Sequence, residues 1–177
     1  GEYENDETIC VVREYIQGIS LLERTNDRSL TEREAIPILI QLCDILTYLH
    51  SQCPPIIHRD IKPENIILAE DGSIKLIDFG IARTYEDSRK KDTIIFGTQG
   101  YASPEQYGFS QTDCRSDLFS LGIIMGYLLT GKTDREAVAK TLTNKRILHI
   151  YQKCTDFSPK RRYSSATNLR RALLRSD

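Results

Sequence analysis

Residues 117–130, DLFSLGIIMGYLLT, are apolar on nearly every side, and Gly131 follows them where a helix would stop. A helix without a polar face must be enclosed by other elements, so we expect this segment to be a buried helix with other elements packed around it. Residues 30–52 predict one of them, because Thr31 and Glu34 form a capping box before apolar residues that recur on one face. Pro37 lies inside that pattern and predicts either a kink or a late start of the helix.

The first half of the chain also contains β-branched segments. Residues 9–16 predict one strand, and the runs NIIL and IKLID predict a hairpin, because Asp71-Gly72 between them is a turn signal. Two more helices are predicted near residues 143–153 and 164–174. This order, with a few strands before a series of helices, predicts an α+β fold that is mainly α.

The composition narrows the function classes. The 24 basic and 25 acidic residues nearly cancel, so the net charge offers no case for nucleic acid or an anionic membrane as a partner. The sequence contains no apolar run of transmembrane length and its first residues are acidic, so we expect neither a transmembrane helix nor a secretory signal. Its five cysteines are an odd number without a C-x-x-C pair, which favours free thiols and a cytoplasmic location.

The stretch HRDIKPEN, residues 58–65, carries the chemistry together with Asp78. Phosphoryl transfer needs a group that orients the acceptor hydroxyl, positive charge near the migrating phosphoryl group, and hard oxygen ligands for Mg²⁺. Asp60 can serve the first need, Lys62 the second, and Asn65 with Asp78 the third. The alternative is a pair of surface turns with charged tips, which the whole string with a correctly spaced DFG makes improbable.

These motifs resemble the large C-terminal lobe of a eukaryotic-type protein kinase. HRDIKPEN is similar to the catalytic loop, DFG at 78–80 to the metal-binding turn, and YASPE at 101–105 to the A-P-E element, with Ser103 in place of alanine. The resemblance runs from about residue 9 to residue 174. The Lys62-Pro63-Glu64 sequence resembles serine/threonine kinases, and DFGIAR resembles bacterial members.

The resemblance implies a role for each matching residue. Asp60 would be the catalytic base or hydroxyl-orienting group, Lys62 would contact the γ-phosphate of ATP, and Asn65 and Asp78 would hold Mg²⁺. The remaining roles would be structural: His58 and Phe79 would pack into the hydrophobic spine, Thr98 would hydrogen-bond near Asp60, Asp117 would hold the backbone around Arg59, and Glu105 would pair with Arg162.

The resemblance also implies a hinge and an activation loop. Glu14 and Ile16 in REYIQG would offer backbone groups to adenine, with Ile67 beneath the ring, while Arg13 either narrows that pocket or turns outward. Thr93 is the candidate phosphosite, with Arg59 and Arg83 as its ligands. The alternative for Thr93 is an ordinary loop threonine.

The Gly-rich loop and the ATP-binding lysine of a kinase small lobe are not found in residues 1–57. We therefore expect residues 1–18 to be the last small-lobe strand and hinge, and residues 19–177 to be the C-terminal lobe with its catalytic loop at 58–65 and activation segment at 78–105. The chain would be either a fragment of a larger kinase or a naturally truncated homologue. Alone it would have little activity and would self-associate through the exposed face between the lobes.

The leading hypothesis is a serine/threonine protein kinase that uses ATP and Mg²⁺ to phosphorylate protein substrates. The alternatives are a pseudokinase-like binding module without catalysis and a kinase of small molecules. Retention of Asp60, Asn65 and Asp78 argues against the first alternative, and the P-E-N and A-P-E-like sequences argue against the second.

Overall fold

The computed structural model describes residues 2–4, 9–11, 14–84, 98–108 and 111–175, and only the backbone of residues 2–4, 9–11 and 83–84. The helices are α1 (Leu21–Arg24), α2 (Glu32–His50), α3 (Cys114–Thr130), α4 (Arg135–Thr141), α5 (Lys145–Cys154) and α6 (Ala166–Leu174). The strands are β1 (Glu2–Glu4), β2 (Ile9–Val11), β3 (Gly18–Ser20), β4 (Ile56–Ile57), β5 (Ile66–Ala69), β6 (Ile74–Leu76) and β7 (Arg83–Thr84). Short 3₁₀ turns are η1 (Pro63–Asn65), η2 (Pro104–Tyr107) and η3 (Pro159–Arg161).

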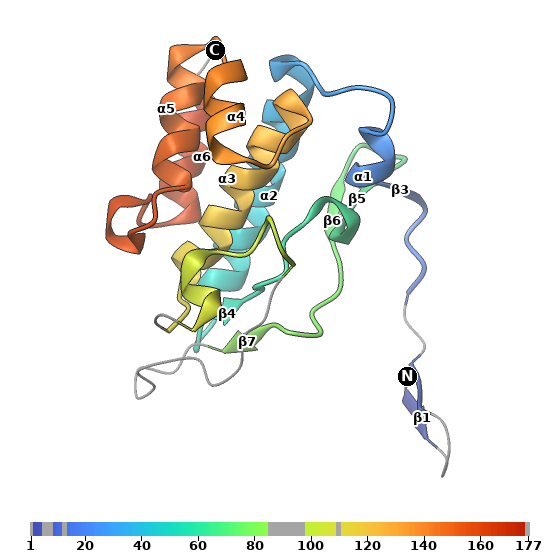
Figure 1. Cartoon of the computed structure of the whole chain (residues 1–177). Coiled ribbons are helices and arrows are strands. Elements are labelled where there is room, and N and C mark those ends of the chain that lie inside the picture. The colour runs from blue at the N-terminus through green and yellow to red at the C-terminus, as the bar shows by residue number, and fades with distance from the viewer. Residues whose placement is uncertain (1, 5–8, 12–13, 85–97, 109–110, 176–177) are drawn as a thin grey trace.

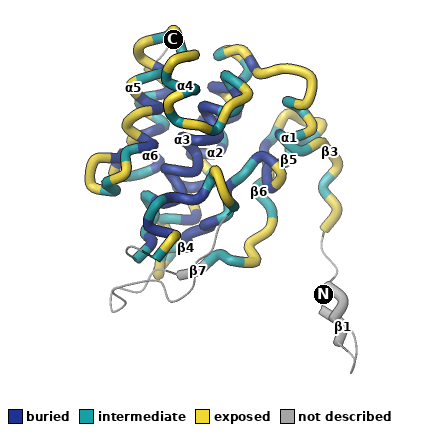
Figure 2. The backbone as a smooth tube through the Cα atoms, in the orientation of Figure 1, coloured by how far each residue is buried: buried dark blue, intermediate teal, exposed yellow. Residues whose placement is uncertain are grey.

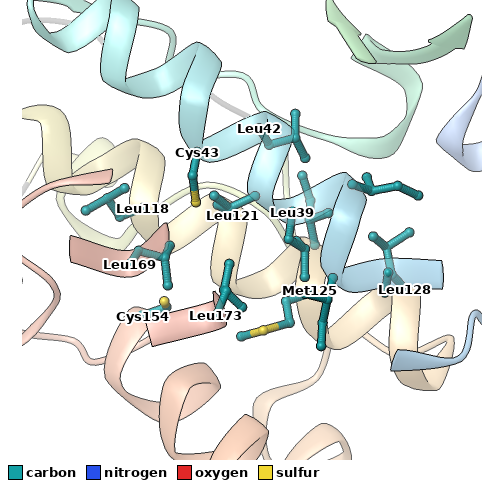
Figure 3. Close-up of a cluster of buried hydrophobic side chains, with 14 of the residues drawn as sticks. Leu39, Leu42, Cys43, Leu118, Leu121, Met125, Leu128, Cys154, Leu169 and Leu173 are labelled. Carbon is teal, nitrogen blue, oxygen red and sulfur yellow. The ribbon is translucent and has the colours of Figure 1, made fainter. Parts of the chain in front are cut away.

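Helix α3 is the buried helix that the sequence predicts. It begins after Asp113, whose side chain accepts the N–H of Arg115, and it ends at Gly131, which is left-handed with φ 71°. Helices α2, α4 and α5 all pack against it (Figure 1). Figure 3 shows leucine and methionine side chains of α2, α3 and α6 meeting in the common core. Enclosure by other helices therefore replaces the polar face that α3 lacks.

Two glycines let α5 and α4 approach α3 closely. A Cβ atom added at Gly122 would lie 2.5 Å from the Cβ of Cys154 and 2.9 Å from the Cγ2 of Thr155. One added at Gly126 would lie 2.8 Å from the ring of Tyr151. The small side chains thus set the distance between α3 and its neighbours, because real Cβ atoms do not approach other atoms so closely.

Helix α2 follows its predicted pattern. Its first turn is capped by Glu34, whose carboxylate accepts the N–H of Thr31 at 2.9 Å. The helix begins at Glu32 and continues through Pro37, so of the two alternatives the late start is wrong and the kink stays a prediction. Pro37 lies in the second turn, where it removes one helical hydrogen bond and its ring crowds the Arg33 carbonyl. The apolar face of α2 packs on α3 and α6.

The strands form three small sheets. The predicted hairpin is confirmed as β5 and β6, and β3 adds to β5 on the other side, so the order is β3-β5-β6 with antiparallel pairs. Strand β4 pairs with β7, and β1 pairs with β2. The predicted strand over 9–16 is too long: β2 ends at Val11, and residues 14–17 are irregular and mostly exposed. Those residues have no strand partner among the described residues.

Helices α4 and α1 were not predicted, because each is too short to show a clear period. The fold is nevertheless α+β and mainly α, as expected. Within the described part of the chain, none of the helices combines the length and apolarity needed to cross a lipid bilayer.

Candidate active site

The site is built on the turn that follows β4. Asp117 projects from the buried helix α3, and its carboxylate accepts the N–H of His58 at 3.0 Å and the N–H of Arg59 at 2.9 Å. Arg59 is left-handed, with φ 68°, a conformation that costs a non-glycine residue about 1–2 kcal/mol. Asp117 therefore stabilises a strained turn and fixes the direction in which Asp60 leaves it.

His50, the last residue of α2, supports Asp117. Its Nε2 lies 2.9 Å from the Asp117 Oδ2, the oxygen that also accepts the His58 N–H. The sequence analysis missed His50, because no motif or local pattern separates it from an ordinary helix-terminal histidine. The contact connects α2, α3 and the turn at 58–60 in one buried hydrogen-bonded cluster.

Asp60 receives three hydrogen-bond donors from different parts of the chain. The hydroxyl of Thr98 donates to its Oδ1 at 2.7 Å, the amide of Asn65 donates to its Oδ2 at 3.0 Å, and the Nζ of Lys62 lies 3.0 Å from Oδ2. Burial raises the pKa of Asp60, but the hydrogen bonds from Thr98 and Lys62 outweigh burial and hold its pKa below the usual 3.8. The carboxylate is thus ionised and oriented at neutral pH.

The segment from Thr98 to Tyr107 is attached to the same turn at two points. Lys62 Nζ donates to the Thr98 hydroxyl at 3.0 Å, so Thr98 contacts both Lys62 and Asp60 as expected. The side chain of Gln106 donates to the Arg59 carbonyl at 2.7 Å and caps η2 through Ser103. Gln106 is buried, and the sequence analysis missed it because its partner lies 47 residues away.

Asn65 and Asp78 carry the oxygen atoms that fit a divalent metal. The side-chain nitrogen of Asn65 is directed to Asp60, and none of the described residues engages its side-chain oxygen Oδ1. Asp78 is exposed and left-handed, with φ 62°, and its Oδ1 accepts the N–H of Gly80 at 3.3 Å. Asn65 and Asp78 are brought together by the backbone pairing of β5 and β6. The Ile77 N–H extends this pairing by donating to the backbone carbonyl of Asn65.

The described residues contain no cluster of three or more His, Cys, Asp or Glu side chains arranged to hold a metal. A site with one carboxylate and one amide suits Mg²⁺, which keeps water and phosphate oxygens among its ligands. The donor set therefore fits the ion that the motifs imply.

His58 is buried as a neutral imidazole. Its Nδ1 accepts the N–H of Asp60 at 3.3 Å, and its Nε2 lies 3.2 Å from the Ile77 carbonyl. Burial lowers the pKa of His58 and outweighs the nearby carboxylates. The ring of Phe79 meets the His58 ring edge-on, with the two ring centroids 4.7 Å apart. Phe79 is nevertheless 44% exposed, so the expected enclosure of the Phe79 ring is incomplete. No described element covers the outer part of the Phe79 ring.

Glu105 and Arg162 form the expected buried pair. Arg162 donates from Nη1 to Oε1 at 2.6 Å and from Nη2 to Oε2 at 2.8 Å. Ser116 donates to the same carboxylate, and the guanidinium lies over the ring of Phe119 at 4.8 Å. The pair joins the end of the 98–107 segment to α3 and to η3. Although Arg162 lies in the basic run KRR, it is therefore a buried, paired side chain and not a solvated charge.

The predicted hinge residues lie beside the β3-β5-β6 sheet. Glu14 is exposed, Ile16 is partly buried, and Ile67 in β5 stands opposite Ser20 of β3. Gly18 is required here, because a Cβ atom at this position would lie 2.4 Å from the Leu68 carbonyl oxygen.

Only part of the predicted activation loop and its ligands lies among the described residues. Thr93 lies outside the described residues, as does Arg13 before the hinge. Arg83 is described by its backbone, which pairs with Ile57 of β4. Arg59 is mostly buried, and its Nε donates to the Ile81 carbonyl at 2.7 Å.

An ionised aspartate on a turn held by the central helix, with a metal-type Asn and Asp pair beside it, is the arrangement of a phosphotransferase large lobe. The model of the protein kinase domain matches residues 1–177, so this chain belongs to the protein kinase family and has its fold.

The chain is similar to named serine/threonine kinases of bacteria. It is 42% identical over 138 residues to the probable serine/threonine-protein kinase PknB of Corynebacterium glutamicum, covering 75% of this chain and 21% of the relative. It is 38% identical over 126 residues to serine/threonine-protein kinase PknB of Mycolicibacterium smegmatis, covering 69% of this chain and 20% of the relative.

The similarity is not confined to bacterial proteins. The chain is 36% identical over 151 residues to myosin light chain kinase 3 of Danio rerio, covering 83% of this chain and 21% of the relative. The chain spans about a fifth of the length of these relatives.

Proposed function

We propose that this chain carries the acceptor- and metal-binding half of a serine/threonine protein kinase, which transfers a phosphoryl group from ATP to Ser and Thr hydroxyls of protein substrates. The observation that supports this most directly is the Asp60 carboxylate, held by Thr98, Lys62 and Asn65. The names of the bacterial relatives support the serine/threonine class and a bacterial origin.

Asp60 would position the acceptor hydroxyl. Its lowered pKa keeps it ionised, so it accepts the hydrogen bond of a Ser or Thr hydroxyl and directs the oxygen for attack. A carboxylate with this pKa is a weak base, so orientation is its larger contribution, and the proton moves to it as the new bond forms. Lys62, 3.0 Å from both Asp60 and Thr98, would place its positive charge beside the transferred group.

Asn65 and Asp78 would hold Mg²⁺ through the Asn65 carbonyl oxygen and the Asp78 carboxylate. When bound, Mg²⁺ with ATP supplies the phosphoryl group and neutralises the charge that develops on it. Glu14, Ile16 and Ile67 would contact the adenine end, and phosphorylated Thr93 would bind Arg59 and Arg83. The division into a hinge region at 1–18 and a lobe at 19–177 belongs to the same proposal.

A cytoplasmic location is also part of the proposal. Cys43, Cys53, Cys114 and Cys154 are free thiols in the structure. Free thiols persist in a reducing compartment, which supports that location.

The decisive test uses the full-length protein and its Asp60→Asn variant. Incorporation of labelled phosphate from ATP into a mixed library of Ser- and Thr-containing peptides should fall by about 10²- to 10⁴-fold in the variant. Asp71→Asn is the matched control, because Asp71 is exposed in the β5–β6 turn, where its carboxylate accepts the N–H of Ser73. Equal activity of Asp60→Asn and the wild type, or labelling confined to small hydroxylated metabolites, would refute the proposal.

A further inference from the structure

The near-zero net charge conceals a division of charge along the chain. Residues 132–177 contain 12 Lys and Arg against 4 Asp and Glu, whereas residues 1–131 contain 12 against 21. The C-terminal quarter therefore has a net charge of +8, and the rest has −9. The absence of an electrostatic partner, inferred above from the balance of the whole chain, does not hold for this quarter.

The excess positive charge is exposed on α5, η3 and α6. The exposed cations of these elements and of the residue that follows α6 are Lys145, Arg146, Lys153, Lys160, Arg161, Arg171 and Arg175; we call them the basic face. In the described part of the chain none of the seven forms an ion pair, although Lys153 lies over the Tyr163 ring at 4.5 Å. The neighbouring Arg162 and Arg170 differ, because they pair with Glu105 and Asp44.

The helices that carry this face lie together on one side of the molecule. Helix α5 packs on α3, and α6 packs on α2 and α5, so both turn their polar sides outward. Figure 2 shows these outward sides as exposed, and Figure 1 shows that they lie away from the β3-β5-β6 sheet. Seven like charges that form no ion pair with the described residues repel one another, so an anionic partner would stabilise this arrangement.

We propose that the basic face binds an anionic lipid surface. Clustered Lys and Arg side chains are attracted by the negative potential of phospholipid headgroups, and long cationic side chains reach headgroups while their stems contact apolar surface. Leu174, 47% exposed between Arg171 and Arg175, adds an apolar side chain among the cations. A purely hydrophilic polyanion would gain nothing from that leucine, whereas the boundary of a bilayer would.

Other anionic partners fit the face less well. Proteins that bind single-stranded nucleic acid stack successive bases on several exposed aromatic rings. Among the Phe and Tyr rings of residues 145–175, Phe157 is the single exposed one, and Arg135 already lies over it at 4.9 Å, whereas Tyr151 and Tyr163 are buried. An acidic peptide motif is recognised by arginines clustered at one place, whereas the cations of the basic face are spread over α5, η3 and α6 and include three lysines. Helices α5 and α6 lie away from the β3-β5-β6 sheet (Figure 1), so a membrane on the basic face leaves that sheet uncovered.

Vesicle sedimentation tests the proposal without any measurement of activity. The full-length protein and this chain are mixed with vesicles of phosphatidylcholine plus phosphatidylglycerol, or of phosphatidylcholine alone, at low salt and at about 0.5 M salt, where screening is strong. Binding should require phosphatidylglycerol and disappear at high salt. Lys160→Glu should weaken it several-fold, and Lys160→Glu with Arg161→Glu by about tenfold or more.

Lys75→Glu is the matched control, because Lys75 is an exposed lysine on β6 and its replacement changes the net charge equally. Circular dichroism verifies that each variant is folded. Equal binding to both kinds of vesicle, or equal loss in Lys75→Glu and Lys160→Glu, would overturn the proposal. Tighter binding to a duplex oligonucleotide or to polyglutamate than to the vesicles would also overturn it and would assign the face to that polyanion.

Discussion

The carboxylate of Asp117 accepts the backbone N–H of Arg59 at 2.9 Å, so the central helix determines the conformation of the residue before Asp60. The second oxygen of Asp117 accepts from His58 and contacts His50. The geometry of the candidate catalytic carboxylate is therefore fixed from the core of the protein and not from the surface loops.

Asp117→Asn should reduce the free energy of unfolding by about 1–3 kcal/mol. An amide has only one acceptor oxygen, so one buried N–H of the strained turn would lose its partner. Urea unfolding measures the change, and Asp71→Asn in the exposed turn should alter stability by less than about 0.5 kcal/mol. An Asp117→Asn protein as stable as the wild type would show that the turn does not depend on this carboxylate.

Glu105→Gln and Arg162→Met should each cost about 3–5 kcal/mol, because each leaves one buried charge without its partner. The double variant should lose much less than the sum of the two, since no unpaired charge remains. A double-mutant cycle in urea provides the coupling free energy. Strictly additive losses would mean that the two side chains stabilise the fold independently.

Gly122→Ala should destabilise the protein by about 1–3 kcal/mol, although alanine favours helices over glycine. Its Cβ would meet atoms close to the α5 backbone, whereas at Gly126 it would mainly meet the movable side chains of Tyr151 and Val138. Gly126→Ala should therefore cost less than Gly122→Ala. Thermal unfolding of both variants tests this order, and a reversed order would place the closest contact of α3 elsewhere.

The stability should fall as the pH is lowered through the range just below 6.5. Burial lowers the pKa of His58 from 6.5, so in that range the unfolded chain binds a proton that the folded protein does not. The loss should approach about 1.4 kcal/mol per pH unit until the pH reaches the folded-state pKa. Urea unfolding at several pH values measures this slope.

The exposed His149 provides the control for that slope. His149→Gln should leave the slope unchanged, because the buried imidazole of His58 is still present. A His58 ring that titrates at or above pH 6.5 by NMR would contradict the explanation.

Thr98→Ala in the full-length protein should lower kcat about 10- to 100-fold, because Asp60 loses the donor that orients it. The hydrogen bond from Thr98 lowers the pKa of Asp60, so its removal raises that pKa and moves the acid limb of the pH–rate profile to higher pH. Thr98→Ser should retain both properties. If the acid limb is unchanged in Thr98→Ala, the ionisation of Asp60 is not what produces that limb.

The sequence predicted the elements with strong local patterns. The all-apolar run defined α3, the capping box and periodicity defined α2, and the Asp-Gly turn defined the β5–β6 hairpin. Strands β3 and β7 were missed because they are only two or three residues long and form by pairing with distant segments.

The candidate site shows the same limit. Motifs pointed to Asp60, Lys62, Asn65 and Asp78, but not to His50 or Gln106. Those two act through partners 67 and 47 residues away, and no local pattern indicates a partner at that distance.

The hydrogen bond from Thr98 to Asp60 closes a loop of chain across 38 residues. The entropy of bringing distant segments together is lost before their contact forms, so this bond depends on the fold around it. The orientation of Asp60 is therefore a property of the folded chain and not of the short motif that contains it.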